Sequence, residues 1–165
     1  MSRIESGGLR LSTSLVDLGD LASEAMSLAG LGPDAKRVRI SYPNEAKPAR
    51  FDLGLASRLA ANLLRNAALY SPPASPIDFD LVEDGGDLLI KVRDRGPGLP
   101  DEELDAIFER FKRGKGAPGG GLGLGLAICR GIAAAHGGSV RARNAERGGL
   151  EVVAVFPSCV EDPPR

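Results

Sequence analysis

One helical segment constrains the fold more than any other part of the chain: LGLASRLAANLLRNAALY, residues 53–70. It is the most strongly apolar helical pattern in the sequence, so any fold must cover most of its surface with other elements. Asp52 stands directly before it, where a carboxylate caps the first turn of a helix. The prolines of SPP follow it and prevent its continuation, because proline lacks the backbone N–H and clashes with the preceding turn. The prediction is a helix whose two ends are set by these flanking residues.

Shorter patterns on either side predict the remaining elements. Apolar residues at helical spacing predict a helix over residues 16–30 that ends on glycine. Strands are predicted at residues 36–42, 49–52, 76–83, 87–93, 139–143 and 150–156. A short acidic helix is expected at 100–108, a loop at 112–120 and a helix at 121–135. Because helices and antiparallel strands are partly segregated, the predicted fold class is α+β, a two-layer α/β sandwich whose mixed, mostly antiparallel sheet packs against three main helices.

Composition limits the classes of protein to which the chain can belong. Its 165 residues suffice for one domain with a core, and 42% hydrophobic with 26% charged residues is typical of a globular chain. A net charge of −1 argues against a nucleic-acid binder that relies on bulk electrostatics. No apolar run approaches the roughly 20 residues of a membrane helix, and no signal-peptide pattern is seen. Cys129 and Cys159 lack metal-type spacing and are expected to be reduced and structural, and the single His136 excludes a multi-histidine metal site.

The stretch VRDRGPGLP, residues 92–100, places a carboxylate where a predicted strand ends. Asp94 is followed by glycines two and four residues later, at Gly96 and Gly98. One interpretation is an ordinary turn, since Asp, Gly and Pro all favour turns. The other is that a flat ligand lies against this backbone while the carboxylate binds its edge.

Two asparagines on the apolar helix need partners. Asn62 and Asn66 are four residues apart and therefore share a face. A buried amide without a partner costs roughly 1–3 kcal/mol, so the two either bond to nearby loops and water or line a polar site. In the second case an asparagine oxygen is a hard ligand suited to magnesium, which completes its shell with water and phosphates.

Glycines are concentrated in GKGAPGGGLGLG, directly before a helical pattern. Glycines that open a helix let backbone N–H groups approach phosphate oxygens, and the helix N-terminus favours the negative charge. The segment lacks the preceding strand and following acid of a dinucleotide-binding fold, and the Lys-Ser/Thr of a P-loop. A phosphate-binding loop and a flexible loop without function both remain open for this segment taken alone.

Four motifs occur in order along the chain: NLLRNA, DRGPG, IFERF and GLGLGLAI. Their order and separations resemble the N, G1, F and G2 boxes of the ATP-binding domain of histidine kinases, the Bergerat-type fold shared with gyrase, Hsp90 and MutL. The resemblance extends from SLVDLGDL to EVVAVFP, almost the whole chain. The segments FKRG, GLGLGLAICRGIAAAHGG, RNAERGG and RIESGGLRL are most similar to those of the Kdp-type, potassium-responsive sensor kinases.

The resemblance implies roles for single residues. Asp94 would accept a hydrogen bond from the adenine amine, and Gly96 and Gly98 would keep the wall beneath the base free of side chains. Asn66 corresponds to the magnesium-binding asparagine of the family. Asn62 stands where the related ATPases carry a glutamate general base, and an amide cannot abstract a proton from water. The residues assigned to ATP or to catalysis are Asn62, Asn66, Tyr70, Asp94, Gly96, Gly98, Phe108, Arg113, Gly121, Leu122, Gly123, Leu124 and Gly125.

Other residues of the resemblance have alternatives. Phe108 and Phe111 are the F-box aromatics, or else plain core residues. The basic residues of the expected lid either contact phosphates or face solvent: Lys112, Arg113 and Lys115. Leu69 departs from the family, which often has Lys or Arg there. That phosphate contact is then absent or comes from Arg65, Lys112 or Arg113.

The resemblance also implies a division of the chain. Residues 1–12 would be the tail of a missing dimerisation helix and its linker, residues 13–158 the ATP-binding catalytic domain, and residues 159–165 a disordered tail. His136 would be a structural residue that interacts favourably with the dipole at a helix C-terminus, and not the phosphoacceptor.

The expected function is that of a sensor histidine kinase catalytic domain. With ATP and Mg2+ as cofactors, it would donate the γ-phosphoryl group to a histidine on a separate dimerisation domain, for transfer to a response regulator. The domain would be the cytoplasmic part of a membrane-anchored, dimeric parent and would bind no nucleic acid. The alternatives are a stand-alone ATPase of the gyrase or MutL type, a regulatory nucleotide-binding module without kinase activity, and an anti-sigma-factor serine kinase.

Overall fold

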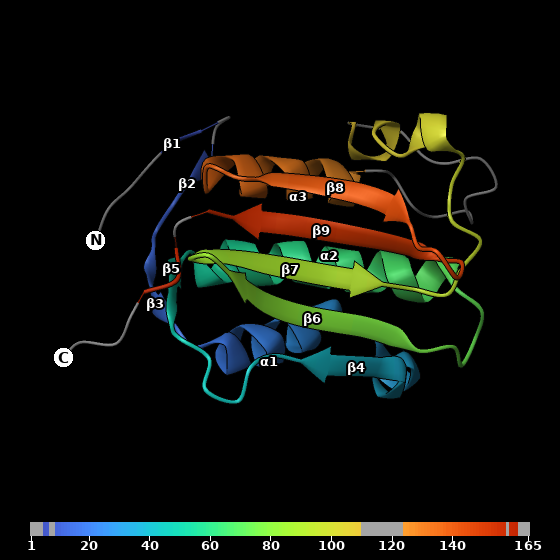
Figure 1. The fold of residues 1–165 in the computed structure, drawn as a ribbon, viewed down its shortest axis with the longest axis horizontal. Helices are drawn as coiled ribbons and strands as arrows, with labels where there is room; N and C mark the ends of the chain where they lie inside the picture. The colour runs from blue at the N-terminus through green and yellow to red at the C-terminus, as the bar shows by residue number, and fades with distance from the viewer. Residues whose placement is uncertain (1–4, 7–8, 110–123, 158, 162–165) are drawn as a thin grey trace.

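The computed structural model describes residues 5–6, 9–109, 124–157 and 159–161, which form a two-layer α+β sandwich (Figure 1). One layer is a five-stranded sheet with the strand order β4-β6-β7-β9-β8. Its strands are β4 (Val38–Ser41), β6 (Ile77–Asp84), β7 (Asp87–Arg93), β9 (Leu150–Phe156) and β8 (Ser139–Asn144). Only β4 runs parallel to its neighbour, and the other pairs are antiparallel. The predicted mixed, mostly antiparallel sheet is confirmed.

Three helices form the second layer, behind the sheet in Figure 1. They are α1 (Leu18–Ala29), α2 (Leu53–Tyr70) and α3 (Leu124–Ala135). The central helix α2 has the predicted ends, and the Asp52 carboxylate accepts a 3.0 Å hydrogen bond from the backbone N–H of Leu55. Gly30 ends α1 in the left-handed conformation with φ 56°, a cap that glycine adopts without a steric penalty.

The core lies between α2 and the sheet. The helix buries Leu59, Leu63 and Leu64 almost completely. Alternate residues of the strands face it, because side chains along a strand point to opposite faces. The fully buried residues of the three central strands include Ile77, Phe79, Leu81, Leu88, Ile90, Ala154 and Phe156. Removing a leucine side chain from such a site costs about 2–5 kcal/mol, so α2 is where the apolar pattern stabilises the fold most.

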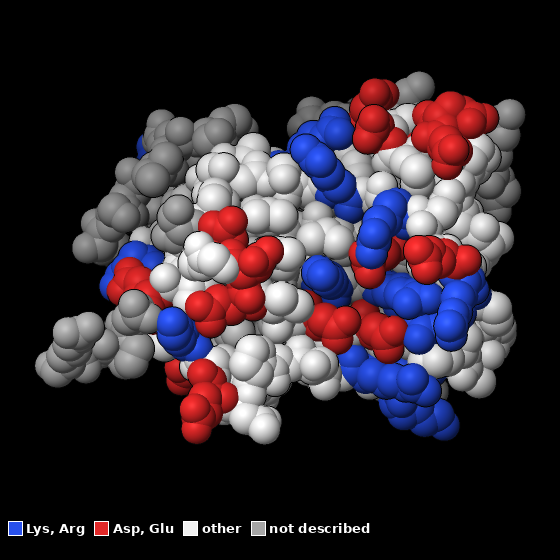
Figure 2. All heavy atoms as spheres, viewed as in Figure 1, with Lys and Arg blue, Asp and Glu red and all other residues white. Residues whose placement is uncertain are grey.

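The other face of the sheet is polar and carries a row of alternating charges. The registers place Arg39, Asp78, Arg93, Glu151 and Arg143 side by side, one from each strand in the order β4-β6-β7-β9-β8. Figure 2 shows basic and acidic side chains interleaved on this face. Opposite charges directly across strands stabilise a sheet by a few tenths of a kcal/mol to about 1 kcal/mol per pair, and the pair Arg143–Glu151 closes to 2.7 Å.

Several short elements were not predicted. β3 (Ser14–Val16) pairs with β5 (Ala49–Phe51), and η1 (Gly32–Arg37) includes two residues that the alternation assigned to a strand. The acidic helix expected at 100–108 consists of two 3₁₀ turns, η2 (Asp101–Glu103) and η3 (Ala106–Phe108). A segment this short is too costly to nucleate as an α-helix, and among its residues only Ile107 and Phe108 are buried.

The two ends of the chain differ from expectation in their described residues. At the N-terminus, β1 (Glu5–Ser6) pairs with β2 (Leu9–Arg10) where the tail of a helix was expected. Two glycines stand between these strands in the sequence, and glycine disfavours the expected helix.

The C-terminal segment 159–161, expected in a disordered tail, is packed into the fold. Cys159 is buried and its carbonyl accepts a 2.7 Å bond from the backbone N–H of Arg50. Val160 forms a β-bridge with Ala49. The side chains of Arg50 and Glu161 pair at 2.9 Å. The expected tail was wrong for these three residues, because their backbone groups pair with the edge of β5, which only the folded chain brings near.

Both cysteines are free and buried thiols. Burial raises the pKa of Cys129 to about 12 and that of Cys159 to about 11, so both stay protonated at neutral pH, as expected for structural cysteines. Within the described residues, no helix has both the length and the apolar character required to cross a membrane.

His136 joins the end of α3 to the start of α2. Its ring stacks on Phe156 with 4.1 Å between the ring centres. Nε2 accepts a 3.1 Å hydrogen bond from the backbone N–H of Asp52, and Nδ1 donates to the carbonyl of Ile132 at 2.8 Å. Burial lowers the pKa of His136. The structural role was predicted, and the ring contacts the C-terminal end of α3 through the Ile132 carbonyl, as a neutral donor and not as a charged group.

This arrangement predicts a loss of stability in weak acid. The pKa of His136 is lower in the folded than in the unfolded chain, where it is about 6.5, so the unfolded chain binds the extra proton first. Stability is therefore full above about pH 6.5 and is expected to fall below it, by at most about 1.4 kcal/mol per pH unit. Urea unfolding from pH 8 to 5 measures it, and the variant His136→Asn should lack this component. Equal pH slopes in the two proteins would contradict the assignment.

Candidate functional site

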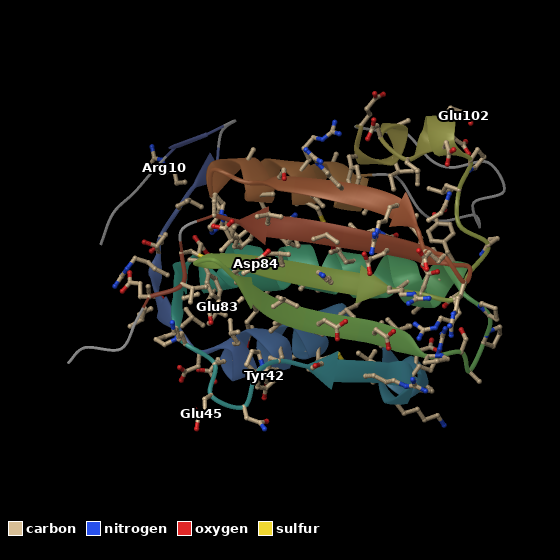
Figure 3. The ribbon with its side chains drawn as sticks, in the orientation of Figure 1. Arg10, Tyr42, Glu45, Glu83, Asp84 and Glu102 are labelled. Atoms are coloured by element: carbon tan, nitrogen blue, oxygen red, sulfur yellow. The ribbon has the colours of Figure 1, made fainter. Side chains whose placement is uncertain are left out.

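The predicted site residues that the structure describes gather at the end of the molecule to which β7 points in Figure 1. Asp94 follows β7, Asn66 and Tyr70 lie in the last turns of α2, and Gly125 lies in the first turn of α3. The turn between β6 and β7, with Glu83 and Asp84, lies at the opposite end of the sheet, whereas Glu102 of η2 lies at the site end (Figure 3).

Asp94 is a buried carboxylate, only 5% exposed. Its Oδ1 accepts hydrogen bonds from the backbone N–H groups of Gly96 at 2.7 Å and Leu150 at 3.2 Å. Burial raises its pKa, and these two N–H bonds limit the rise. No described residue bonds to the second oxygen, Oδ2. This carboxylate oxygen is an acceptor without a protein partner among the described residues, and it is suited to bind a donor from a ligand.

Gly96 and Gly98 are required by the protein's own packing. A Cβ at Gly96 would lie 2.5 Å from the carbonyl oxygen of Tyr70, the last residue of α2. Gly98 has φ +73°, and a Cβ there would overlap the side-chain oxygen of Asn144. The two glycines therefore let the G1 loop, residues 95–99, lie directly against the end of α2 and against the β8–β9 turn. Packing within the protein is therefore one reason for these glycines. The resemblance implied another, that they keep the wall beneath the adenine base free of side chains.

Asn62 joins α2 to α3. It is 6% exposed, and its amide nitrogen donates to the carbonyl of Gly125 at 3.2 Å. Its oxygen accepts a short hydrogen bond from Arg65, whose guanidinium also donates to the carbonyl of Leu28 at 3.1 Å. The amide is thus satisfied inside the protein and fixes the first turn of the G2 helix. Arg65 would have to leave both carbonyl partners to reach a phosphate.

Asn66 has a different environment one turn further along α2. It is half-buried, and its side chain forms no hydrogen bond with the described residues. The described residues also contain no group of three or more His, Cys, Asp or Glu that could hold a metal by themselves. A single amide oxygen fits magnesium, which takes its other ligands from water and phosphates. Leu69, which stands where the family often has Lys or Arg, is 46% exposed.

Phe108 belongs to the core in this structure. It is 1% exposed, and the guanidinium of Arg130 on α3 lies 5.5 Å from its ring centre. The F-box aromatic thus packs η3 against α3, as the alternative interpretation proposed. Several predicted residues fall outside the described part of the chain: Phe111, Lys112, Arg113, Lys115, Gly121, Leu122 and Gly123. Leu124 is the first residue of α3.

Sequence reasoning missed Arg37, a buried arginine at the site end. Its guanidinium donates to the Ser71 hydroxyl at 2.6 Å and to the carbonyls of Ser75 at 2.8 Å and Pro72 at 3.1 Å. It holds the loop after α2 against η1, and its charge lowers the pKa of nearby Asp94 slightly against the effect of burial. No signal in the sequence marks it, because an arginine in KRVRISY is typical of an exposed strand position.

A two-layer sandwich with a buried carboxylate at a strand end, a half-buried asparagine on the central helix and Gly125 in the first turn of the third helix is the arrangement expected of one class of protein, the ATP-binding domains. The family model of histidine kinase-, DNA gyrase B- and HSP90-like ATPases matches residues 52–159. The chain belongs to this family, and within it to the catalytic domains of histidine kinases.

Its relatives include sensor kinases of known sequence and structure. The sensor protein KdpD of Escherichia coli is 37% identical over 150 residues, which are 90% of this chain and 17% of that protein. SenX3 of Mycolicibacterium smegmatis is 33% identical over 148 residues, 86% of this chain and 38% of that protein. The predicted Kdp-type resemblance is confirmed, although the chain spans under a fifth of the length of KdpD.

Solved structures have the same fold. The mycobacterial sensor histidine kinase MprB has a TM-score of 0.73 and 28% identity, covering 87% of this chain and 97% of that one. Full-length ShkA in complex with AMPPNP has a TM-score of 0.75 and 25% identity, covering 97% of this chain and 34% of that one. The α+β fold class is thereby confirmed.

Proposed function

We propose that this domain binds ATP with Mg2+ and donates the γ-phosphoryl group to a histidine of a separate dimerisation domain, which passes it to a response regulator. The observation that supports this most strongly is Asp94. Its Oδ1 is occupied by two backbone N–H groups, while Oδ2 has no partner among the described residues. This geometry leaves one fixed acceptor for the adenine amine.

Asn66 is the residue proposed to bind Mg2+, since its side chain is half-buried and without a described partner. When bound with ATP, Mg2+ neutralises charge on the transferred phosphoryl group. Tyr70 and residues 121–125 are proposed to flank the nucleotide and its phosphates. Lys112 and Arg113 are proposed to supply the basic contact that Leu69 lacks, because Arg65 is already bonded to two carbonyl partners on α1 and α2.

Asn62 supports transfer to a protein over hydrolysis. Hydrolysis needs a group that accepts a proton from water, and an amide cannot do so at neutral pH. The amide of Asn62 is also engaged on both sides, by Gly125 and Arg65. ATP would then persist on the domain until an external imidazole is placed in line with the γ-phosphoryl group.

The parent of this domain is proposed to be a dimeric, membrane-anchored sensor whose catalytic part faces the cytoplasm, where ATP is available. The matches to proteins named sensor protein KdpD support this. Residues 1–12 would connect the dimerisation helices to the catalytic domain. Within this segment, the backbone N–H of Ser12 bonds to Asp52 at 2.9 Å, next to the start of α2.

The variant Asp94→Asn tests the nucleotide site. Its oxygen can keep the two backbone bonds, but its amide group then faces the adenine amine, donor against donor. ATP should bind about 10- to 100-fold more weakly, the scale of a lost hydrogen bond to a charged group, about 1.5–3 kcal/mol. Calorimetric titration with Mg2+ present measures it.

Purine riboside triphosphate, which lacks the amine, is the control ligand. Its affinity should change much less between wild type and Asp94→Asn, because it cannot make the contact that the substitution removes. Unchanged ATP affinity in the variant would refute the site, and an equal loss for both ligands would show general damage instead of base recognition.

A further inference from the structure

The turn between β8 and β9, residues 144–150, is built against the adenine end of the site. It contains all but the first residue of the motif RNAERGG, residues 143–149, which lies outside the four nucleotide boxes. The backbone of Leu150 exchanges two bonds with Asp94: its carbonyl accepts from the Asp94 N–H at 3.0 Å, and its N–H donates to Oδ1 at 3.2 Å. A Cβ at Gly149 would overlap the carbonyl group of Asp94. The turn and the carboxylate are therefore in direct contact.

Asn144 ties this turn to the G1 loop. Its Oδ1 accepts from the backbone N–H of Leu99 at 2.9 Å, and its Nδ2 donates to the carbonyl of Leu99 at 2.7 Å. The side-chain amide thus bonds to both the N–H and the carbonyl of one residue, as a residue of a neighbouring antiparallel strand does. Gly98, with φ +73° and no side chain, leaves the space that the amide occupies.

The G1 loop and the Asp94 before it are held by several contacts, one of which is the ion pair between Arg95 and Asp78 of β6 at 2.8 Å. Gly96 rests against the carbonyl of Tyr70, Leu99 is bonded by Asn144, and Asp94 is bonded by Leu150. Asn144 makes its contact with a side chain, through two hydrogen bonds to the backbone of Leu99. It is also exposed, so its loss leaves no cavity in the core.

We propose that Asn144 is a positioning residue that sets adenine specificity by fixing the G1 loop, and with it the direction of the Asp94 carboxylate. It acts through Leu99 and does not touch the nucleotide itself. This inference rests on the proposed function, in which Asp94 binds the adenine amine.

The expected effect is a loss of discrimination more than a loss of binding. Two neutral hydrogen bonds with the exposed Asn144 side chain hold the loop in one position. Without them the loop samples other positions, and the favourable contact of Oδ2 with the amine is made only part of the time. The ratio of the affinities for ATP and for purine riboside triphosphate should fall roughly five- to tenfold.

The experiment measures both affinities by calorimetry, with Mg2+, for wild type, Asn144→Ala, Asn144→Asp and Asp94→Asn. Glu146→Ala is the matched control, because Glu146 is exposed in the same turn. Asn144→Ala should lower the ratio while the analogue's affinity changes less than about twofold. Asn144→Asp should lower it too, since its second oxygen would face the carbonyl of Leu99. Glu146→Ala should keep the wild-type ratio, and the unfolding midpoints of the free proteins should stay close.

Each other outcome overturns the inference in a recognisable way. If Asp94→Asn abolishes discrimination while Asn144→Ala keeps it, the proposed function stands and the role of Asn144 is refuted. If Asn144→Ala weakens both ligands equally, the residue has only a structural role. If Asp94→Asn itself leaves the ratio unchanged, the adenine contact and the inference that rests on it fall together.

Discussion

Incubated with radiolabelled ATP and Mg2+, this chain alone is expected to acquire no acid-labile phosphate. Its single histidine is His136. Nε2 of that ring accepts the N–H of Asp52, Nδ1 donates to Ile132, and the ring is stacked on Phe156. An imidazole must present a free nitrogen lone pair to attack phosphorus, and this ring has none available. His136 also lies at the C-terminal end of α3, away from Gly125, where that helix meets the site.

Addition of the cognate dimerisation domain is expected to change this from no transfer to measurable transfer. In-line placement of an external histidine supplies most of the catalysis in phosphoryl transfer. Label should then appear on the histidine of the added domain, in an acid-labile form. ATP turnover by the chain alone should remain slow, because Asn62 cannot serve as a base. Label on His136, or rapid hydrolysis by the chain alone, would contradict the proposed function.

The variant Gly138→Ala is expected to be strongly destabilised. Gly137 and Gly138 end α3 in a Schellman motif, in which the N–H of Gly138 bonds to Ala133 at 2.8 Å and that of Gly137 to Ala134 at 2.9 Å. A Cβ at Gly138 would overlap the carbonyl group of Val155 in β9. The obstacle is backbone in a paired strand, so helix and sheet would have to separate. The expected cost is about 3 kcal/mol, a large part of a typical stability of about 5–15 kcal/mol.

Gly137→Ala is the matched control. Gly137 has φ +79°, but its nearest neighbour, a side-chain atom of Pro157, would be 3.9 Å from a Cβ. This variant should be destabilised only by the cost of the left-handed backbone conformation for alanine, about 1–2 kcal/mol. Urea unfolding midpoints at constant m-value compare the two. A Gly138→Ala variant as stable as Gly137→Ala would show that the turn yields more easily than the packing indicates.

The features that the sequence predicted well depend on neighbours along the chain. α2 has the predicted ends because its cap, Asp52, and its terminating prolines are adjacent to it. Asp94 was placed correctly at a strand end because alternation stops there and glycines follow. Position in the chain was enough to select this carboxylate, although its orientation depends on Leu150, which is distant in the sequence.

The features that were missed depend on contacts between distant segments. The local pattern predicts an exposed strand position for Arg37, whereas the loop after α2 folds over its side chain. Cys159 has partners only once β5 is formed beside it. In the sequence, Asn144 lies in the connection between two predicted strands, and its pairing with Leu99 spans 45 positions. Periodicity and turn chemistry report on a few neighbouring residues, so none of these contacts leaves a local pattern.

The charge row on the outer sheet face has a consequence for association between copies of the domain. Its terminal members, Arg39 on β4 and Arg143 on β8, lie on the two outermost strands of the sheet order. Exposed strand edges are templates for pairing with another chain, and charged side chains on them oppose aggregation. An edge-to-edge approach of two copies in which these positions meet, β4 to β4, β8 to β8 or β4 to β8, brings arginine toward arginine. In the dimeric parent that we propose, where two copies of the domain lie at high local concentration, this repulsion would oppose pairing of their sheets.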